Sequence, residues 1–171
     1  MAARTRGAGS APPRAGWPEP EPETVAGQAL TEVILETFRL HGRLQEAAQT
    51  LAAAGELTAA HWQVIGGVLD EPRSVAEIAR RMGMARQGVQ RIADLLVDRG
   101  LATYQPNPAH RRAKLLAPTE AGFWAVRRIS LVQHPWATHV GEQIGARDLR
   151  TALKTMQRLT AALEAENHPP R

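Results

Sequence analysis

One stretch of the sequence, residues 73–101, restricts the fold more than any other; it reads RSVAEIARRMGMARQGVQRIADLLVDRGL. Ser74 followed by Glu77 is a capping box, a pairing that marks the start of an α-helix. Gly83 supplies a turn after that helix, and a second helix is expected from about residue 85 to residue 99. Two short helices joined by a tight, glycine-containing turn are the helix-turn-helix pattern.

Both helices are expected to have a buried apolar face, and the second also has a distinctive polar face. The positions expected to point inward are Val75, Ile78, Ala79 and Met82 in the first helix and Val89, Ile92, Leu95 and Leu96 in the second. The outward face carries Arg86, Gln87, Gln90 and Arg91. Arginine forks to guanine and glutamine pairs with adenine through two hydrogen bonds, and these residues lie at the end that a recognition helix presents to bases. An ordinary polar face is the alternative, but it would more often carry Glu and Lys.

A hairpin is expected directly after the second helix. The segments LATYQ and AKLLAP have the character of short strands, with PNPAHRR between them. A hairpin in this position is a wing, whose tip reaches phosphates or the adjacent minor groove, where arginine is favoured. We expect Arg111 or Arg112 to make the tip contact, with Lys114 nearer the body of the protein. The alternative for each of them is a solvated charge.

Positive charge is concentrated in this region. Residues 73–114 contain nine Lys or Arg residues and three Asp or Glu residues, whereas the whole chain of 171 residues has a formal net charge of +4. Such a local positive field is expected of a protein that binds the phosphate backbone. A solvated helix face remains the alternative.

The rest of the chain is expected to be helical. A helix is predicted over residues 25–54 with Gly55 as its C-cap, and another begins after Thr58 as N-cap. After the wing, a helix should begin at Thr119, and Pro135 should kink it or start a new one. The last helix places Leu149, Leu153, Met156, Leu159 or Thr160, and Leu163 at nearly heptad spacing, so it needs a partner, either in its own chain or in a second copy.

These elements define the expected architecture. The fold class is mainly α with a small β-wing: a winged helix-turn-helix core at residues 57–119, within one domain over residues 25–171, with terminal helices at 25–56 and 120–167. Residues 1–24 are rich in Pro, Gly and Ala and bury too little apolar surface to offset their ordering entropy, so a disordered tail is expected.

Several classes of function are disfavoured. The chain has no cysteine, no apolar run of the length that a membrane span needs, and no secretory signal, so a cytoplasmic protein is expected. His134 and His139 are five residues apart and do not share a helical face, so no metal site is expected. No glycine loop for phosphates, nucleophile motif or isolated carboxylate pair favours an enzyme, and no cofactor is expected.

The combined pattern resembles the MarR family of winged helix-turn-helix transcription regulators. The resemblance rests on LTAAHWQVI, SVAEIARRMGMARQGVQRIADLLVDRGLA and NPAHRRAKLLAPTEAG, and it extends over about residues 25–166. It implies an obligate homodimer, with the first and last helices interleaved between protomers. It also implies double-stranded DNA as the partner, with an inverted repeat as the site. The DNA-contacting residues that we expect are Ser74, Arg86, Gln87, Gln90, Arg91, Arg111, Arg112 and Lys114.

Members of this family commonly repress transcription and release DNA when a small ligand, often an aromatic acid, binds between the dimerisation and DNA-binding regions. In this chain the matching region would be walled by Phe38, His41, His61, Trp62, Ile65 and Phe123, with Trp136 as a further candidate. The alternative is that these side chains are ordinary core, as aromatic residues at helical spacing usually are.

Two departures from the family pattern affect the DNA contacts. Ala85 stands where members usually have Ser or Thr, which removes a helix cap worth about 1 kcal/mol. The wing usually reads Asp-Pro-x-Asp-Arg-Arg, and here both acids are replaced, by Asn107 and His110. Those acids orient the wing arginines, so a looser wing is expected, or one in which His110 takes their place. Because histidine changes charge near neutral pH, pH-sensitive DNA binding is a hypothesis.

Two other functions are compatible with a winged helix. A protein-interaction module would show no sequence-specific DNA affinity and no dependence on salt. A non-specific architectural DNA binder would keep the salt dependence and lose the preference for sequence. The basic segment argues against the first, and the Gln and Arg side chains of the recognition face argue against the second.

Overall fold

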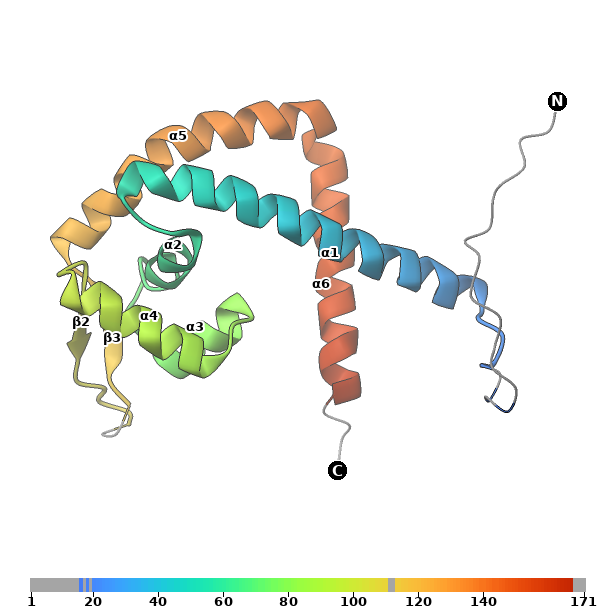
Figure 1. The fold of residues 1–171 in the computed structure, drawn as a ribbon, viewed down its shortest axis with the longest axis horizontal. Coiled ribbons are helices and arrows are strands. Elements are labelled where there is room, and N and C mark those ends of the chain that lie inside the picture. Colours follow the sequence, from blue (N-terminus) through green and yellow to red (C-terminus); the bar gives the residue numbers. More distant parts are fainter. Residues whose placement is uncertain (1–15, 17, 19, 111–112, 168–171) are drawn as a thin grey trace. The chain divides into compact units, whose positions relative to one another are not determined.

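The computed structural model describes residues 16, 18, 20–110 and 113–167 (Figure 1). The described residues divide between His41 and Gly42 into two units, each of which is described by itself. The elements in chain order are α1 (Val25–Ala52), the 3-10 turn η1 (Ala53–Gly55), α2 (Ala59–Gly66), β1 (Arg73–Ser74), α3 (Val75–Met82), α4 (Arg86–Asp98), β2 (Ala102–Gln105), β3 (Leu115–Pro118), α5 (Glu120–Ile144) and α6 (Ala146–Asn167). The mainly α fold with a small β-wing is therefore confirmed. Most of the predicted tail, residues 1–24, lies outside the described residues.

The first unit contains α1 as far as His41. Its apolar side chains are largely exposed, and they are Val25, Leu30, Val33, Ile34, Leu35, Phe38 and Leu40. A helix that exposes so many large apolar residues needs a partner surface to cover them.

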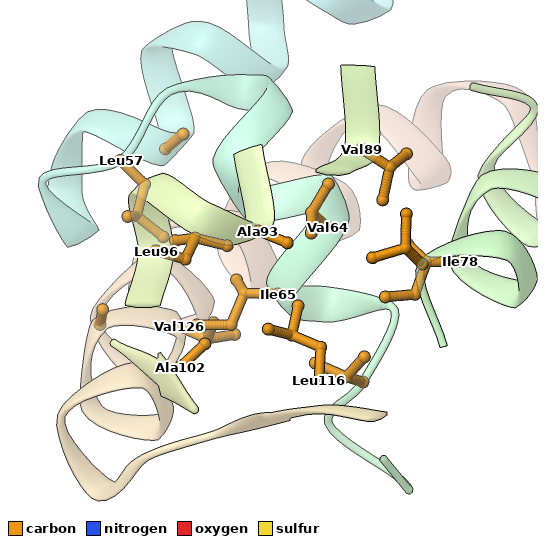
Figure 2. Close-up of a cluster of buried hydrophobic side chains, with 14 of the residues drawn as sticks. Leu57, Val64, Ile65, Ile78, Val89, Ala93, Leu96, Ala102, Leu116 and Val126 are labelled. Carbon is orange, nitrogen blue, oxygen red and sulfur yellow. The ribbon is translucent and has the colours of Figure 1, made fainter. Parts of the chain in front are cut away.

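The core lies in the second unit. Ile65 from α2, Ile78 from α3, Leu96 from α4, Leu116 from β3 and Ile129 from α5 are all fully buried. Figure 2 shows side chains from α2, α3, α4, α5 and the wing strands meeting in this cluster. The core therefore fixes the helix-turn-helix against the base of the wing.

Local sequence explains where the helices begin. Thr58, Ser74 and Thr119 each accept a hydrogen bond from a backbone N–H in the first turn of the helix that follows. The predicted caps at Thr58 and Ser74 and the predicted helix start at Thr119 are therefore confirmed. Gly83, the predicted turn residue, ends α3 with φ 62°, a conformation that favours glycine. Helix α4 begins without a side-chain cap, because Ala85 occupies its N-cap position.

The wing belongs to a three-stranded antiparallel sheet of order β1-β3-β2. The two predicted wing strands pair with Tyr104 opposite Leu116 and Gln105 opposite Leu115. Strand β1 was not predicted; its two residues pair with the other edge of β3, with Arg73 opposite Leu116. This strand joins the entry to α3 to the wing.

Two local expectations were wrong, and one of the two alternatives for Pro135 is excluded. Glu56, with φ 57°, rather than Gly55 takes the left-handed conformation after the first helix. Gly55 is instead needed for space, because a Cβ there would lie 2.5 Å from the carbonyl oxygen of Ala125.

Helix α5 continues through Pro135, so no new helix starts there. Leu95 is 45% exposed because the buried stripe of α4 is narrow and runs through Val89, Ala93 and Leu96.

Helix α6 is amphipathic, as its spacing predicts, but its apolar face is open. Leu149, Leu153, Met156 and Leu163 are all exposed, and Leu159 is half-buried. Described by itself, the second unit therefore presents an uncovered apolar seam along α6.

Candidate nucleic-acid interface

The outward face of α4 is as expected. Arg86, Gln87, Gln90 and Arg91 are all exposed, and Val89 on the opposite side is fully buried. Arg86 is the first residue of the helix, so these side chains occupy its first two turns. Figure 1 shows the two wing strands beside α4. The helix therefore offers donors and acceptors in the half that a recognition helix inserts into the major groove.

Ser74 is more enclosed than a free DNA contact would be, at 8% exposed. Its backbone N–H and its hydroxyl both donate to Oε2 of Glu77, at 2.8 and 2.7 Å, and its Oγ accepts from the backbone N–H of Glu77. These hydrogen bonds lower the pKa of Glu77. The hydroxyl is thus already used by the cap, and a phosphate contact from Ser74 stays a prediction.

Arg73 adds less to the positive surface than its charge suggests. Its side chain is 10% exposed, and its guanidinium donates to both carboxylate oxygens of Asp70, to Oε1 of Glu71 and to the carbonyl of Gly67. Asp70 and Glu71 lie just before the segment in which the charges were counted. Including them lowers the excess of positive charge, and the exposed cations of this region are on α3, α4 and the wing.

Gln90 has partners that the sequence did not reveal. Its Nε2 lies 2.9 Å from Oδ1 of Asp94 and 2.8 Å from Oη of Tyr104, and that hydroxyl donates to the same Oδ1 at 2.7 Å. Burial, followed by the hydrogen bond to Asp94, raises the pKa of Tyr104 to about 12. Tyr104 belongs to β2, so this contact joins the wing to the recognition helix. Its separation of 14 residues from Gln90 explains why no local pattern signalled it.

The wing turn is held by Asn107, one of the two residues that replace the family's acids. Its Oδ1 accepts from the backbone N–H groups of Ala109 and His110, at 2.9 and 3.3 Å. An asparagine can therefore close the turn without a carboxylate. Arg111 and Arg112, the predicted tip contacts, lie outside the described residues. Lys114 is described, with its Nζ 5.8 Å from the centre of the Tyr104 ring.

A cleft of about 360 Å³ lies between the recognition helix and the wing. Its lining residues are Ser74, Val75, Ala76, Arg86, Gln90, Asp94, Tyr104, Ala113 and Lys114. Arg86 and Lys114 give the cleft a cation on each side, and Asp94 is engaged by its neighbours. Four of the eight predicted DNA-contacting residues thus meet in one place.

The predicted effector residues differ widely in how deeply they are buried. Ile65 is fully buried in the core, Trp62 packs against that core, and Phe123 is 49% exposed. His61 closes the capping box of α2, where its Nδ1 accepts from the backbone N–H of Thr58 at 3.4 Å. Burial and the nearby charge of Arg99 lower the pKa of His61. Phe38 and His41 are exposed and belong to the other compact unit.

The described ranges contain neither a metal-binding cluster nor a membrane-spanning helix. Over residues 20–110 and 113–167, no group of three or more His, Asp or Glu side chains is arranged to hold a metal ion. In the same part of the chain, no helix has both the length and the apolarity to cross a membrane.

Comparison with known proteins agrees with this geometry. The MarR family model matches residues 56–113, the segment that contains α2, the helix-turn-helix and the start of the wing. An uncharacterized protein of Mycobacterium tuberculosis, Rv2011c, is 33% identical over 137 residues, which is 80% of this chain and 96% of that protein. A protein of Mycobacterium bovis, Mb2034c, matches to the same extent.

Solved structures have the same fold. The transcriptional repressor CouR, bound to a 23-mer DNA duplex, is 28% identical with a TM-score of 0.63, over 82% of this chain and 99% of that chain. The MarR family regulator SP03579 has a TM-score of 0.69 at 18% identity, over 84% and 95% of the two chains. Staphylococcus aureus MarR, in complex with salicylate and kanamycin, has a TM-score of 0.68 at 14% identity, over 81% and 95%. With the family model and the M. tuberculosis relative, these findings place the chain in the MarR family of winged-helix transcription regulators.

Proposed function

We propose that this protein is a homodimeric transcriptional repressor that binds an inverted repeat in double-stranded DNA. The observation that carries the proposal is the face of α4, where Arg86, Gln87, Gln90 and Arg91 are exposed over a buried Val89. The packed core and the wing hold the helix backbone that carries these side chains, which gives them a defined approach to the bases. That CouR, 28% identical, is a repressor solved on DNA supports the same role here.

The exposed apolar residues of the terminal helices support the dimer. Helix α6 exposes Leu149, Leu153, Met156 and Leu163, and α1 exposes seven large apolar residues up to Leu40. We infer that a second copy of the chain covers both surfaces. Two copies related by a twofold axis would present two α4 helices to successive major grooves, about 10 base pairs apart.

The dimer can be tested by sedimentation equilibrium. Leu153→Glu should raise the dimer dissociation constant, because it places a charge in the seam, whereas Thr155→Glu on another face of α6 should leave it unchanged. A monomeric wild-type protein, or equal effects of the two substitutions, would contradict this assembly.

Release by a small aromatic ligand is the second element of the proposal. Trp62 of α2 is partly buried against the core, Phe123 of α5 is about half exposed, and S. aureus MarR, which has the same fold, was solved in complex with salicylate and kanamycin. A ligand that binds one spacing of the two recognition helices better than the other would shift the equilibrium toward release. A salicylate titration that leaves operator affinity unchanged would argue against this class of effector.

The experiment that tests the function is selection of bound sequences from a random duplex pool at two salt concentrations. Enrichment of one inverted repeat, with binding that weakens steeply as salt rises, is the expected result. Salt-dependent binding without an enriched sequence would indicate an architectural protein. Absence of binding at both concentrations would indicate a module that binds protein.

A further inference from the structure

The contact between Gln90, Asp94 and Tyr104 determines how Gln90 can meet a base. The three polar groups touch one another, with separations of 2.9, 2.8 and 2.7 Å. Gln90 itself remains exposed on the recognition face. The cluster therefore holds a side chain that is still accessible to DNA.

The direction of each hydrogen bond follows from chemistry. The ionised Asp94 carboxylate accepts and does not donate, so the Tyr104 hydroxyl must donate to it, and the amide nitrogen of Gln90, rather than its oxygen, must face it. Because the hydroxyl proton of Tyr104 is committed to Asp94, Tyr104 can only accept from Gln90. The flipped amide would place Oε1 against a carboxylate oxygen, and repulsion excludes it.

The three separations are nearly equal, so both acceptors lie on the same side of the Gln90 nitrogen. They subtend roughly 60° there, whereas the two N–H bonds of an amide diverge by about 120°. One N–H that points between Asp94 and Tyr104 can be shared by both acceptors, which leaves the other N–H pointing away from them, whereas two N–H groups that each bend by about 30° toward one acceptor would both be used. In the shared arrangement, Gln90 keeps one donor and its Oε1 acceptor for a partner outside the protein.

We propose that Asp94 and Tyr104 position Gln90 so that it reads adenine and rejects guanine at one base pair of each half-site. This inference rests on the proposed function. The major-groove edge of adenine presents one acceptor, N7, and one donor, N6, which match the remaining donor and acceptor of Gln90. Guanine presents two acceptors, N7 and O6, and therefore no donor for Oε1. A free glutamine could turn Oε1 away from O6, whereas a held one would keep the two oxygens facing each other.

The surroundings keep this arrangement intact at neutral pH. Burial and Asp94 raise the pKa of Tyr104, so the hydroxyl stays protonated well above physiological pH. Lys114 lies over the Tyr104 ring, which adds a cation–π contact from β-wing residues to the same cluster. Asp94 and Tyr104 touch no base themselves and act as positioning residues.

The test first finds the base pair that Gln90 reads. Selection with wild type and with Gln90→Ala should differ at one position of each half-site, which should be adenine in the wild-type site. Affinities are then measured for duplexes with adenine, guanine or 7-deazaadenine there. Wild type should prefer adenine to guanine by roughly five- to hundred-fold, and loss of N7 in 7-deazaadenine should weaken binding.

Removing the contacts that hold Gln90 should weaken the preference for adenine over guanine without abolishing DNA binding. In Tyr104→Phe and in the double variant Asp94→Ala/Tyr104→Phe, the preference for adenine over guanine should fall several-fold, and more in the double variant. Affinity for a scrambled duplex and its salt dependence should change little by comparison. Asp98→Asn, which removes a carboxylate one turn along the same helix, should keep the wild-type preference.

The outcomes separate this inference from the proposed function. An enriched inverted repeat whose adenine-to-guanine preference is the same in wild type and the double variant would overturn the inference and leave the proposed function standing. The same holds if Gln90→Ala changes no position, or changes one that is not adenine. Absence of sequence-specific binding by wild type would overturn both. Melting temperatures of the variants show whether each one is folded when it is assayed.

Discussion

Arg73 lies within the fold against Asp70, with its Nη2 2.7 Å from Oδ2 of that carboxylate. The Arg73 side chain is 10% exposed, and the same guanidinium also donates to the carbonyl of Gly67. Arg73 begins the short strand that pairs with the wing, so this ion pair fixes the entry to the helix-turn-helix. A charge enclosed in this way is costly when its partner is removed.

Asp70→Asn should therefore destabilise the protein in a pH-dependent way. The hydrogen bond from Arg73 lowers the pKa of Asp70 in the folded state. A carboxyl whose folded pKa is depressed stabilises the fold above its unfolded pKa, near 4, and loses that contribution as the pH falls through the folded value. The difference between wild type and Asp70→Asn in the free energy of unfolding, from urea titrations, should be full at pH 7 and narrow below pH 4.

The matched control for that series is Glu142→Gln, an exposed carboxylate on α5. It should show little difference from wild type at either pH. A gap between wild type and Asp70→Asn that stays constant down to pH 2.5 would contradict the assigned role of Asp70.

Ala85→Ser should stabilise the recognition helix. Ala85 is the N-cap of α4, is exposed, and has extended backbone angles of φ −65° and ψ 131°, which are those of an N-cap. A serine hydroxyl there can accept from a free N–H of the first turn, worth about 1 kcal/mol. Chemical unfolding should show a gain of that size, whereas Ala109→Ser in the wing loop should show none. A loss of stability in Ala85→Ser would count against the assigned cap.

Two glycines should respond in opposite ways to alanine. A Cβ on Gly122 would meet the carbonyl oxygen of Leu101 and the side chain of Ile65, so Gly122→Ala must displace backbone and should destabilise strongly. Gly66, the last residue of α2, has open space around the same position. Gly66→Ala should be neutral or stabilising by up to about 1 kcal/mol. Thermal unfolding of both variants measures the contrast, and equal effects would contradict the packing described here.

Features set by neighbours in the chain could be predicted from the sequence. The caps at Thr58, Ser74 and Thr119 and the turn at Gly83 depend on contacts within a few residues, and the wing strands pair within one hairpin. Features set by long-range packing could not. Gly55 is required by the carbonyl of Ala125, and the pairing of β1 with β3 joins residues more than forty positions apart.

The candidate site likewise has some features that the sequence could predict and others that it could not. Exposure of Arg86, Gln87, Gln90 and Arg91 follows from helical periodicity, and the structure agrees. The burial of Arg73 depends on its ion pair with Asp70, and the restraint of Gln90 depends on its contact with Tyr104. Counting the charges in the sequence reveals neither contact. Leu95 was misplaced because periodicity indicates the direction of the buried stripe but not its width.

His110 provides a test of pH-dependent DNA binding. Its backbone N–H is held by Asn107 in the wing turn, and its side chain lines a cleft with Glu71, Arg73, Glu77, Arg80 and Arg81. The hypothesis of pH-dependent DNA binding predicts that operator affinity falls as the pH rises from 6 to 8. Fluorescence anisotropy should show this fall in wild type and a flatter profile in His110→Ala. An identical pH profile in the two proteins would show that His110 does not cause the pH dependence of operator affinity.

The proposed function requires that the exposed face of α4 reads the DNA sequence. The most direct measurement is the affinity for the selected inverted repeat divided by that for a scrambled duplex, at 50 and 200 mM salt, in wild type and Arg91→Ala. Wild type should show a ratio of about a thousand or more, both affinities should fall with salt, and Arg91→Ala should lower the ratio by roughly five- to hundred-fold. A wild-type ratio near one, or a ratio that Arg91→Ala leaves unchanged, would contradict the claim.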